Sequence, residues 1–194
     1  RRLGDVNPNA PLEYHQVSER HDFLQVQVQD LEQSAAGLQH VIRELDEVMK
    51  RDFLTVFNQA AEAFPRYFQT LFGGGKARLE LTDPDDLATT GVEITAQPPG
   101  KRPQSLALLS GGERALTATA LLFAVLKAKP IPFCFLDEVD AMLDEANVGR
   151  FRDLLREFAT QTQFIVITHN RHTMEAAHTI YGVSQEQEGV STII

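Results

Sequence analysis

The chain has 194 residues, of which 43% are hydrophobic, and its 18 Lys and Arg against 27 Asp and Glu give a formal net charge of −9. This acidic balance argues against a protein that binds nucleic acid on its own, because such a protein needs a basic face. The single cysteine, Cys134, excludes a disulfide within the chain, and no apolar run approaches the roughly 20 residues of a membrane span, so we expect an intracellular protein without a membrane segment or signal peptide.

A long amphipathic helix is predicted from Leu12 to about Leu71. Within it, apolar residues recur at alternating steps of four and three, which is the period of a coiled-coil seam. These residues are Leu24, Val28, Leu31, Ala35, Leu38, Ile42, Leu45 and Met49. Such a helix would extend for roughly 90 Å at about 1.5 Å per residue, which is too long for the core helix of a compact domain. We therefore predict a coiled-coil arm whose partner helix comes from another segment or another chain.

Aromatic residues become frequent after Met49, which indicates that the helix enters a globular core. They are Phe53, Phe57, Phe64, Tyr67, Phe68 and Phe72. Pro65 lacks a backbone N–H and its ring clashes with the preceding turn, so we expect a kink or a break there. On this basis the arm comprises residues 1–71 and a head domain comprises residues 72–194.

Strands and helices alternate in the remainder of the chain. The predicted strands are Ala77 to Leu81, Val92 to Ala96, Ile131 to Leu136, Gln163 to Thr168, Thr179 to Ser184 and Gly189 to Ile194. The predicted helices are Arg114 to Lys127, Asn147 to Thr160 and a short one that contains Thr173 to Ala177. The third and fourth strands are continuously apolar and should be buried on both faces. This alternation predicts an α/β fold with a mainly parallel sheet, whose functional groups gather at the C-terminal ends of the strands.

Two Gly-Lys pairs, Gly75-Lys76 and Gly100-Lys101, do not fit a phosphate-binding loop. That loop reads G-x-x-x-x-G-K-[ST], and Ala77 and Arg102 stand where its hydroxyl is required. We predict turns at both places.

Ser110, Gly111 and Gly112 directly precede a predicted helix. The first N–H groups of a helix have no partners within it, and the helix dipole makes that end partly positive. Glycines let an anion approach the backbone closely, and the serine adds a hydroxyl donor. The segment is therefore predicted to contact a phosphate, but without a lysine loop beside it this is half of a phosphate site.

Carboxylates and a histidine follow the two apolar strands. Asp137 suits Mg²⁺, which prefers oxygen ligands, and Glu138 could orient and deprotonate a water that attacks a γ-phosphate. His169 follows the neighbouring strand and could sense or position the γ-phosphate. Asp140 and Asp144 come just after the carboxylate pair and suggest a loop that lies across a subunit boundary.

The order of these motifs resembles the C-terminal half of an ABC-type ATPase head. Leu109 to Glu113 resembles the signature motif, Phe135 to Asp144 resembles Walker B with the D-loop, and Thr168-His169 resembles the switch histidine. Glu113 and the sequence Asp-Glu-Val-Asp at 137–140 are similar to the structural maintenance of chromosomes (SMC) family rather than to transporter ATPases. The resemblance to bacterial SMC proteins covers nearly the whole chain.

The resemblance implies a split ATPase, in which an N-terminal half-head carries Walker A and two complete heads hold two ATP molecules between them. The implied ATP-binding residues are Ser110, Gly111, Gly112, Asp137 and Asp140. Ser110 and the two glycines would contact the γ-phosphate bound on the partner head. Asp137 would also bind Mg²⁺, and Glu138 and His169 would be catalytic.

The implied partners are the N-terminal half-head of the same protein, a second SMC head in a homodimer, a kleisin subunit, and DNA through the assembled complex. The implied location is the cytoplasm, at the nucleoid, and no membrane is involved. ATP hydrolysis would drive chromosome condensation and segregation. It would require the complete dimerised head, because a fragment without Walker A should be inactive. Two alternatives remain open: a zinc-hook-type ATPase of double-strand-break repair, and an inert module that docks a kleisin.

Overall fold

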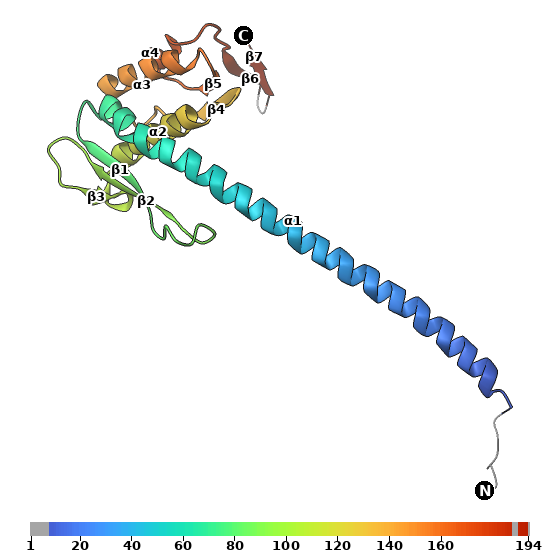
Figure 1. Ribbon diagram of the computed structural model, residues 1–194. Helices are drawn as coiled ribbons and strands as arrows, with labels where there is room; N and C mark the ends of the chain where they lie inside the picture. The colour runs from blue at the N-terminus through green and yellow to red at the C-terminus, as the bar shows by residue number, and fades with distance from the viewer. Residues whose placement is uncertain (1–7, 188–189, 194) are drawn as a thin grey trace. The chain divides into compact units, whose positions relative to one another are not determined.

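The computed structural model describes residues 8–187 and 190–193 (Figure 1). The chain divides into two units, Arg1–Arg51 and Asp52–Ile194, which are described separately. Helix α1, Ala10–Phe72, has 63 residues and contributes to both units. The long helix predicted from the heptad pattern is therefore present.

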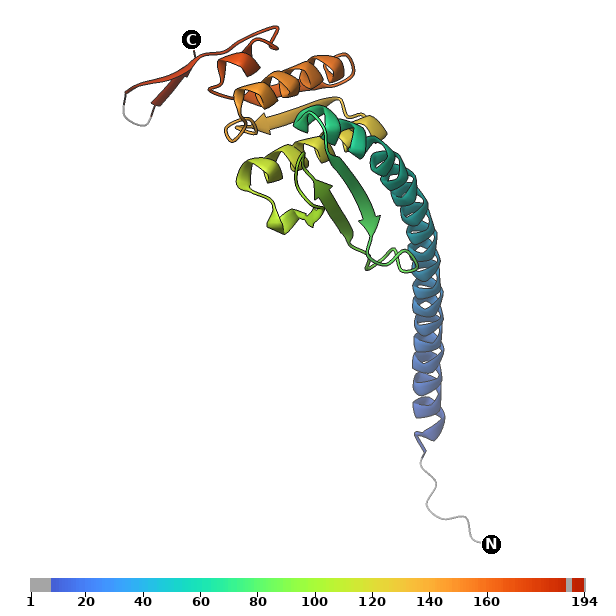
Figure 2. The ribbon, with the colours of Figure 1, turned by 90° about the vertical axis from the view of Figure 1, so that its left-hand side faces the viewer.

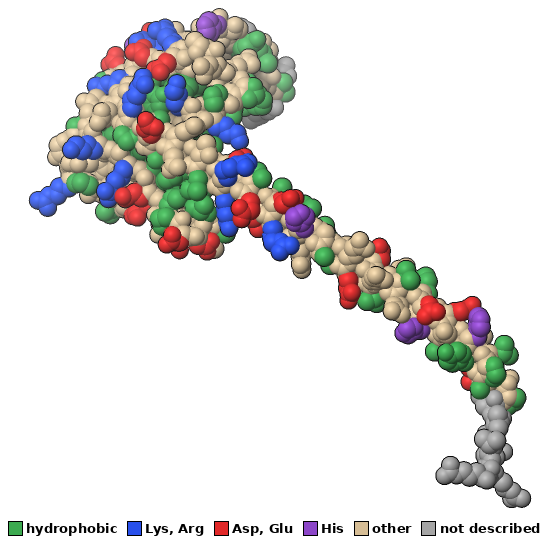
Figure 3. Space-filling model, viewed as in Figure 1, with side chains coloured by type: hydrophobic (Ala, Val, Ile, Leu, Met, Phe, Trp, Pro, Cys, Tyr) green, Lys and Arg blue, Asp and Glu red, His purple; other side chains and the backbone are tan. Residues whose placement is uncertain are grey.

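In the first unit, the apolar seam of α1 is exposed to solvent. Leu24, Leu31, Leu38 and Leu45 are all exposed, and Figure 3 shows hydrophobic side chains at the surface of this helix. A helix in water with such a seam is stabilised when another helix covers it. Nothing within the described part of this unit does so, and a partner helix from another segment or chain stays a prediction.

In the second unit, the last turns of α1 form part of an aromatic core. Phe64, Phe68 and Leu71 have no exposed surface, and the ring of Tyr67 lies 5.5 Å from that of Phe158. Of the kink or break predicted at Pro65, the break does not occur, since α1 continues through this residue to Phe72. Burying an aromatic side chain contributes about 1.5–3 kcal/mol, so the residues around Pro65 offset its cost of roughly 3 kcal/mol in a helix interior.

The first sheet of this unit is antiparallel and has the strand order β1-β2-β3. Its strands are β1 (Lys76–Leu81), β2 (Val92–Gln97) and β3 (Gln104–Ser105), followed by the short 3₁₀ helix η1 (Leu106–Leu108). The first two strands were predicted almost to the residue, whereas β3 and η1 were not predicted. The green strands β1 and β2 lie side by side in Figure 2.

The second sheet pairs β4 (Phe133–Asp137) with β5 (Gln163–Ile167) in parallel, and α3 (Glu145–Phe158) forms the crossover between them. It is the one parallel pair among the described strands, so the prediction of a mainly parallel sheet was wrong. The connection 82–91 between β1 and β2 explains the difference, because parallel pairing needs a crossover of about a dozen residues or more.

One face of β4 and β5 is exposed, although both strands were predicted to be buried on both faces. Cys134 and Leu136 point into the core with α2 (Gly111–Ala128), while Phe133, Phe135, Ile165 and Ile167 are exposed. The exposed fraction is 64% for Phe135 and 56% for Ile167. No described residue of this unit covers this face.

The C-terminal part contains α4 (Arg171–Met174) and an antiparallel hairpin of β6 (Val183–Gln187) and β7 (Val190–Ile193). The strand predicted from Thr179 begins only at Val183, and Gly189 and Ile194, the ends of the last predicted strand, lie outside the described residues. Among the helices that the structure describes, none has the length and apolar character to cross a bilayer.

Candidate functional site

Ser110 is the N-cap of α2, which begins at Gly111, three residues earlier than predicted. Its backbone N–H donates to Glu113 Oε2 over 3.0 Å, and its hydroxyl donates to the same oxygen over 2.8 Å. The N–H of Glu113 in turn donates to Ser110 Oγ over 3.5 Å. This reciprocal capping box fixes the start of the helix. Ser110 itself remains exposed, so the end of the helix is open to an anion.

Lys101, from the loop between β2 and β3, completes the group around Ser110. Its Nζ lies 2.8 Å from Glu113 Oε1, so both oxygens of that carboxylate have partners. The hydrogen bond from Lys101 and then that from the Ser110 backbone hold the pKa of Glu113 below its ordinary value. The spacing Ser-x-x-Glu signals the capping box in the sequence, but nothing in the sequence signals Lys101, which was predicted only as part of a turn.

The loop after β4 lies against the start of α2. A Cβ atom on Gly112 would stand 3.0 Å from the carbonyl oxygen of Met142, and one on Gly111 would stand 3.7 Å from the Met142 sulfur. Gly112 thus allows a close approach that a larger residue would hinder. The structure therefore brings the predicted signature segment next to the predicted D-loop.

Glu138 and His169 lie together at the C-terminal ends of β4 and β5. His169 Nδ1 is 3.8 Å from Glu138 Oε1, and both side chains are exposed. The Glu138 backbone has a φ of 48°, which is uncommon for a residue other than glycine, and its N–H donates to the carbonyl of Ile167 over 2.9 Å. The two residues predicted to be catalytic are thus neighbours in the structure.

Asp140 occupies a different environment from the one predicted. It is 1% exposed, and its Oδ2 accepts hydrogen bonds from the hydroxyls of Thr168, over 2.6 Å, and Thr173. These bonds join the loop after β4 to Thr168, which directly precedes His169, and to Thr173 in α4. A direct contact between Asp140 and ATP stays a prediction, and the structure gives this carboxylate partners within its own chain.

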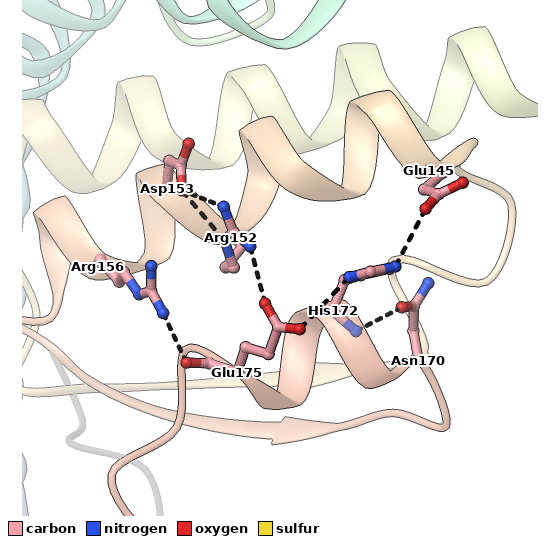
Figure 4. Close-up of polar contacts among 7 residues, drawn as sticks. All are labelled: Glu145, Arg152, Asp153, Arg156, Asn170, His172 and Glu175. Carbon is pink, nitrogen blue, oxygen red and sulfur yellow. Dashed lines mark hydrogen bonds and ion pairs between the residues drawn. The ribbon is translucent and has the colours of Figure 1, made fainter.

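Helix α4, which follows His169, is fastened to α3 by polar contacts (Figure 4). Arg152 donates to the Glu175 carboxylate over 2.9 Å, and Arg156 donates to the Glu175 backbone carbonyl over 2.7 Å. His172 Nε2 lies 3.3 Å from Glu145 Oε1 at the start of α3, and the Asn170 side chain accepts from the His172 N–H. The segment after the histidine loop therefore has fixed partners.

The positions of the carboxylates show whether they fit the Mg²⁺ site predicted at Asp137. Asp137 ends β4 with its side chain exposed, whereas Asp144 caps α3 by accepting from the Asn147 N–H over 2.8 Å. No cluster of three or more His, Cys, Asp or Glu that could hold a metal occurs in the described part of the chain. A single carboxylate fits Mg²⁺, which is commonly bound by one or two carboxylates together with substrate phosphates and water.

Comparison with known proteins gives the family. Residues 11–192 match the family described as RecF/RecN/SMC N terminal domain. The chain belongs to this family. The chromosome partition protein Smc of Bacillus subtilis (strain 168) is 54% identical over 192 residues, which are 99% of this chain but 16% of that protein. The chain therefore spans only a small part of the length of such relatives.

Two solved structures are similar in fold. The Smc head domain with an extended coiled coil, bound to the C-terminal domain of ScpA and derived from Pyrococcus furiosus, has a TM-score of 0.71 and 40% identity, over 94% of this chain and 46% of that one. A chain from work on ATP-driven dimerization and DNA stimulated activation of SMC ATPases has a TM-score of 0.66 and 43% identity, over 75% of this chain and 88% of that one.

These likenesses confirm the predicted SMC family and the α/β ATPase head with a long N-terminal helix. They do not establish the finer prediction that the chain is the C-terminal half of the head, since the description of the matching family names an N-terminal domain. The choice of half depends on the motifs and the exposed surfaces of this chain.

Proposed function

We propose that this chain is the C-terminal half of an SMC ATPase head, and that it hydrolyses ATP only after assembly with the half that carries Walker A. The observation that carries the proposal is the exposed apolar face of β4 and β5. Parallel sheets are normally covered on both faces, whereas the helical core of this unit covers only one face of β4 and β5. Further strands or helices from a second polypeptide segment would complete this one.

The motifs present and absent support the same choice. The sequence has a signature-like helix start and Walker B-like carboxylates, but neither of its Gly-Lys pairs is followed by Ser or Thr as in a phosphate-binding loop. Such a chain can supply groups to a nucleotide that another segment holds. The matching family is described by an N-terminal domain, but the motifs that favour the C-terminal half are present in this chain's own residues.

The geometry supports the following roles for the site residues. Ser110 and the exposed start of α2 receive the γ-phosphate of an ATP held by a second head. Glu138 accepts the proton of the attacking water, and His169, 3.8 Å away, positions the γ-phosphate. Asp137 would hold Mg²⁺, which when bound supplies positive charge against the phosphates. Asp140 is joined to this site through the Thr168 hydroxyl, which donates to its carboxylate.

The biological setting is proposed from the relatives. They are chromosome partition proteins, so the assembled protein would act in chromosome condensation and segregation at the nucleoid, with a second SMC head, a kleisin such as ScpA, and DNA as partners. The 54% sequence identity to a chromosome partition protein Smc favours an SMC protein over a zinc-hook repair ATPase. The third alternative is a module that docks a kleisin without catalysis. It would apply to this chain when it is isolated from the Walker A half-head.

Assembly and activity can be tested together. The chain would be purified alone and together with a Walker A half-head, and phosphate release from ATP would be measured for each part and for the mixture. We expect hydrolysis in the mixture and none in either part. Hydrolysis by this chain alone, or a mixture that assembles without hydrolysing ATP in the presence of Mg²⁺, would contradict the proposal.

A further inference from the structure

The start of α2 contains an electrostatic conflict. Glu113 Oε2 accepts the Ser110 hydroxyl over 2.8 Å and the Ser110 N–H over 3.0 Å. Under the proposed function, that hydroxyl has to face the γ-phosphate of ATP. A carboxylate this close would repel the phosphate. It also already accepts the hydroxyl hydrogen that Ser110 would have to donate to the phosphate.

Lys101 is placed to resolve this conflict. Its ammonium lies 2.8 Å from Glu113 Oε1, the carboxylate oxygen that Ser110 does not use. The Lys101 backbone is fixed as well, because its N–H donates to Pro98 and its carbonyl accepts from the Gln97 side chain. The lysine is thus presented to Glu113 by an ordered turn.

We propose that Lys101 is a positioning residue for ATP-driven engagement of two heads. It neutralises Glu113, so that the start of α2 stays favourable for a nucleotide phosphate. It also holds one carboxylate oxygen, so that the Ser110 hydroxyl can turn to the phosphate while the Ser110 N–H keeps its bond to Glu113 Oε2. This inference rests on the proposed function, because it takes Ser110 as the contact for a phosphate on a second head.

The charge balance leads to a double-substitution test. Lys101→Met removes the ammonium, keeps a similar side-chain length, and leaves Glu113 unneutralised. Glu113→Gln removes the repelling charge, yet its amide oxygen can still accept from the Ser110 N–H in a capping box. If Lys101 acts by neutralisation, the double variant should recover what Lys101→Met loses. If it serves only to hold the turn, the second substitution should not help.

The test uses complete heads, made of this chain and the Walker A half, that also carry Glu138→Gln to slow hydrolysis. The dissociation constant of the ATP-dependent head dimer would be measured by analytical ultracentrifugation, and ATP binding to the single head by equilibrium binding. We expect Lys101→Met to weaken dimerisation roughly tenfold with unchanged ATP binding, because a nearby uncompensated charge opposes the phosphate. Adding Glu113→Gln should restore dimerisation to within about twofold.

Lys76→Met is the matched control, since Lys76 is an exposed lysine on β1 of the same sheet and has no role in the site. If Lys101→Met dimerises as tightly as Lys76→Met, or if Glu113→Gln does not rescue it, the inference is wrong. Ser110→Arg separates this failure from failure of the proposed function. Normal ATP-dependent dimers of Ser110→Arg would reject the proposed function, whereas their loss without an effect of Lys101→Met would reject only the role of Lys101.

Discussion

At the scale of single residues, Glu138 combines a positive φ with a side chain that lies near His169. A positive φ in a residue other than glycine costs on the order of 1–3 kcal/mol and persists only where the surroundings impose it. Here the bond from the Glu138 N–H to Ile167 on the neighbouring strand contributes to that restraint. The strain thus lies at the residue that the proposed function makes the general base.

Glu138→Gln should separate ATP binding from hydrolysis in the assembled head. The amide keeps the shape of the side chain but cannot take a proton, so we expect hydrolysis to fall about 10²–10⁴-fold while ATP-dependent dimers accumulate. Phosphate release and size-exclusion chromatography measure the two effects. Glu80→Gln on β1 is the control and should retain normal activity. Normal turnover by Glu138→Gln would reject its assigned role.

Asp140 offers a prediction that does not depend on ATP. In Asp140→Ala the hydroxyls of Thr168 and Thr173 lose their acceptor inside the protein, and a polar group left unpaired in the interior costs about 1–3 kcal/mol. We expect the free energy of unfolding, measured with urea, to fall by about 2 kcal/mol or more. Thr173→Val, which removes one of the two bonds, should cost less. Equal stabilities of Asp140→Ala and the unaltered chain would show that these bonds contribute nothing.

At the scale of elements, the turn between α1 and β1 depends on Gly75. Its φ is 85°, and a Cβ atom there would stand 2.4 Å from the carbonyl oxygen of Gln97. Gly100 also has a positive φ, 74°, but a Cβ atom there would meet nothing within 4 Å. The two glycines therefore separate the cost of the backbone conformation from the cost of a steric clash.

We expect Gly100→Ala to cost about 1–2 kcal/mol, the penalty for a side chain in the left-handed region. Gly75→Ala carries the same penalty plus the clash with Gln97, so it should destabilise the protein clearly more, by roughly 3 kcal/mol or above. Thermal unfolding of the two variants beside the unaltered chain measures the difference. If both variants melt at the same temperature, the close approach at Gly75 has no energetic consequence.

Elements with a strong apolar period could be predicted from the sequence, and those set by tertiary contacts could not. The seam of α1 and the alternation in β1 and β2 are repeated over enough residues to identify a helix and two strands. Strand direction is not encoded in that period, so the antiparallel first sheet was missed. The expectation of a kink or a break at Pro65 follows a local rule, and the burial of Phe64 and Phe68 offsets the cost of continuing the helix without a break.

The site shows the same division. Ser110, Glu138 and His169 stand in short motifs whose chemistry is readable in order along the chain, and the structure places Glu138 and His169 together. Lys101 and the burial of Asp140 depend on contacts between distant segments, Lys101 with Glu113 and Asp140 with Thr168. No rule based on sequence spacing predicts contacts between distant segments. The sequence could therefore identify the candidate catalytic residues but not the residues that position them.

At the scale of the whole molecule, each of the two units exposes an apolar surface that water does not favour. In the first unit this surface is the seam of α1, and in the second it is the face of β4 and β5. The aromatic pair Phe133 and Phe135, with ring centroids 5.9 Å apart, lies on the second surface. Contiguous exposed apolar patches commonly mark interaction sites. The two surfaces therefore predict two separate associations, one of the arm and one of the head.

The association of the head can be tested with Phe135→Asp. Phe135 is 64% exposed, so this change should leave the unfolding temperature of the chain nearly unaltered. A carboxylate in the centre of a buried interface is costly, and we expect the affinity for the Walker A half-head to fall at least roughly tenfold in a pull-down titration. Leu31→Asp, an exposed apolar position of the first unit, is the control and should bind a Walker A half-head prepared without an arm as tightly as the unaltered chain does. Unchanged binding by Phe135→Asp would mean that the exposed face of β4 and β5 is not where the head is completed.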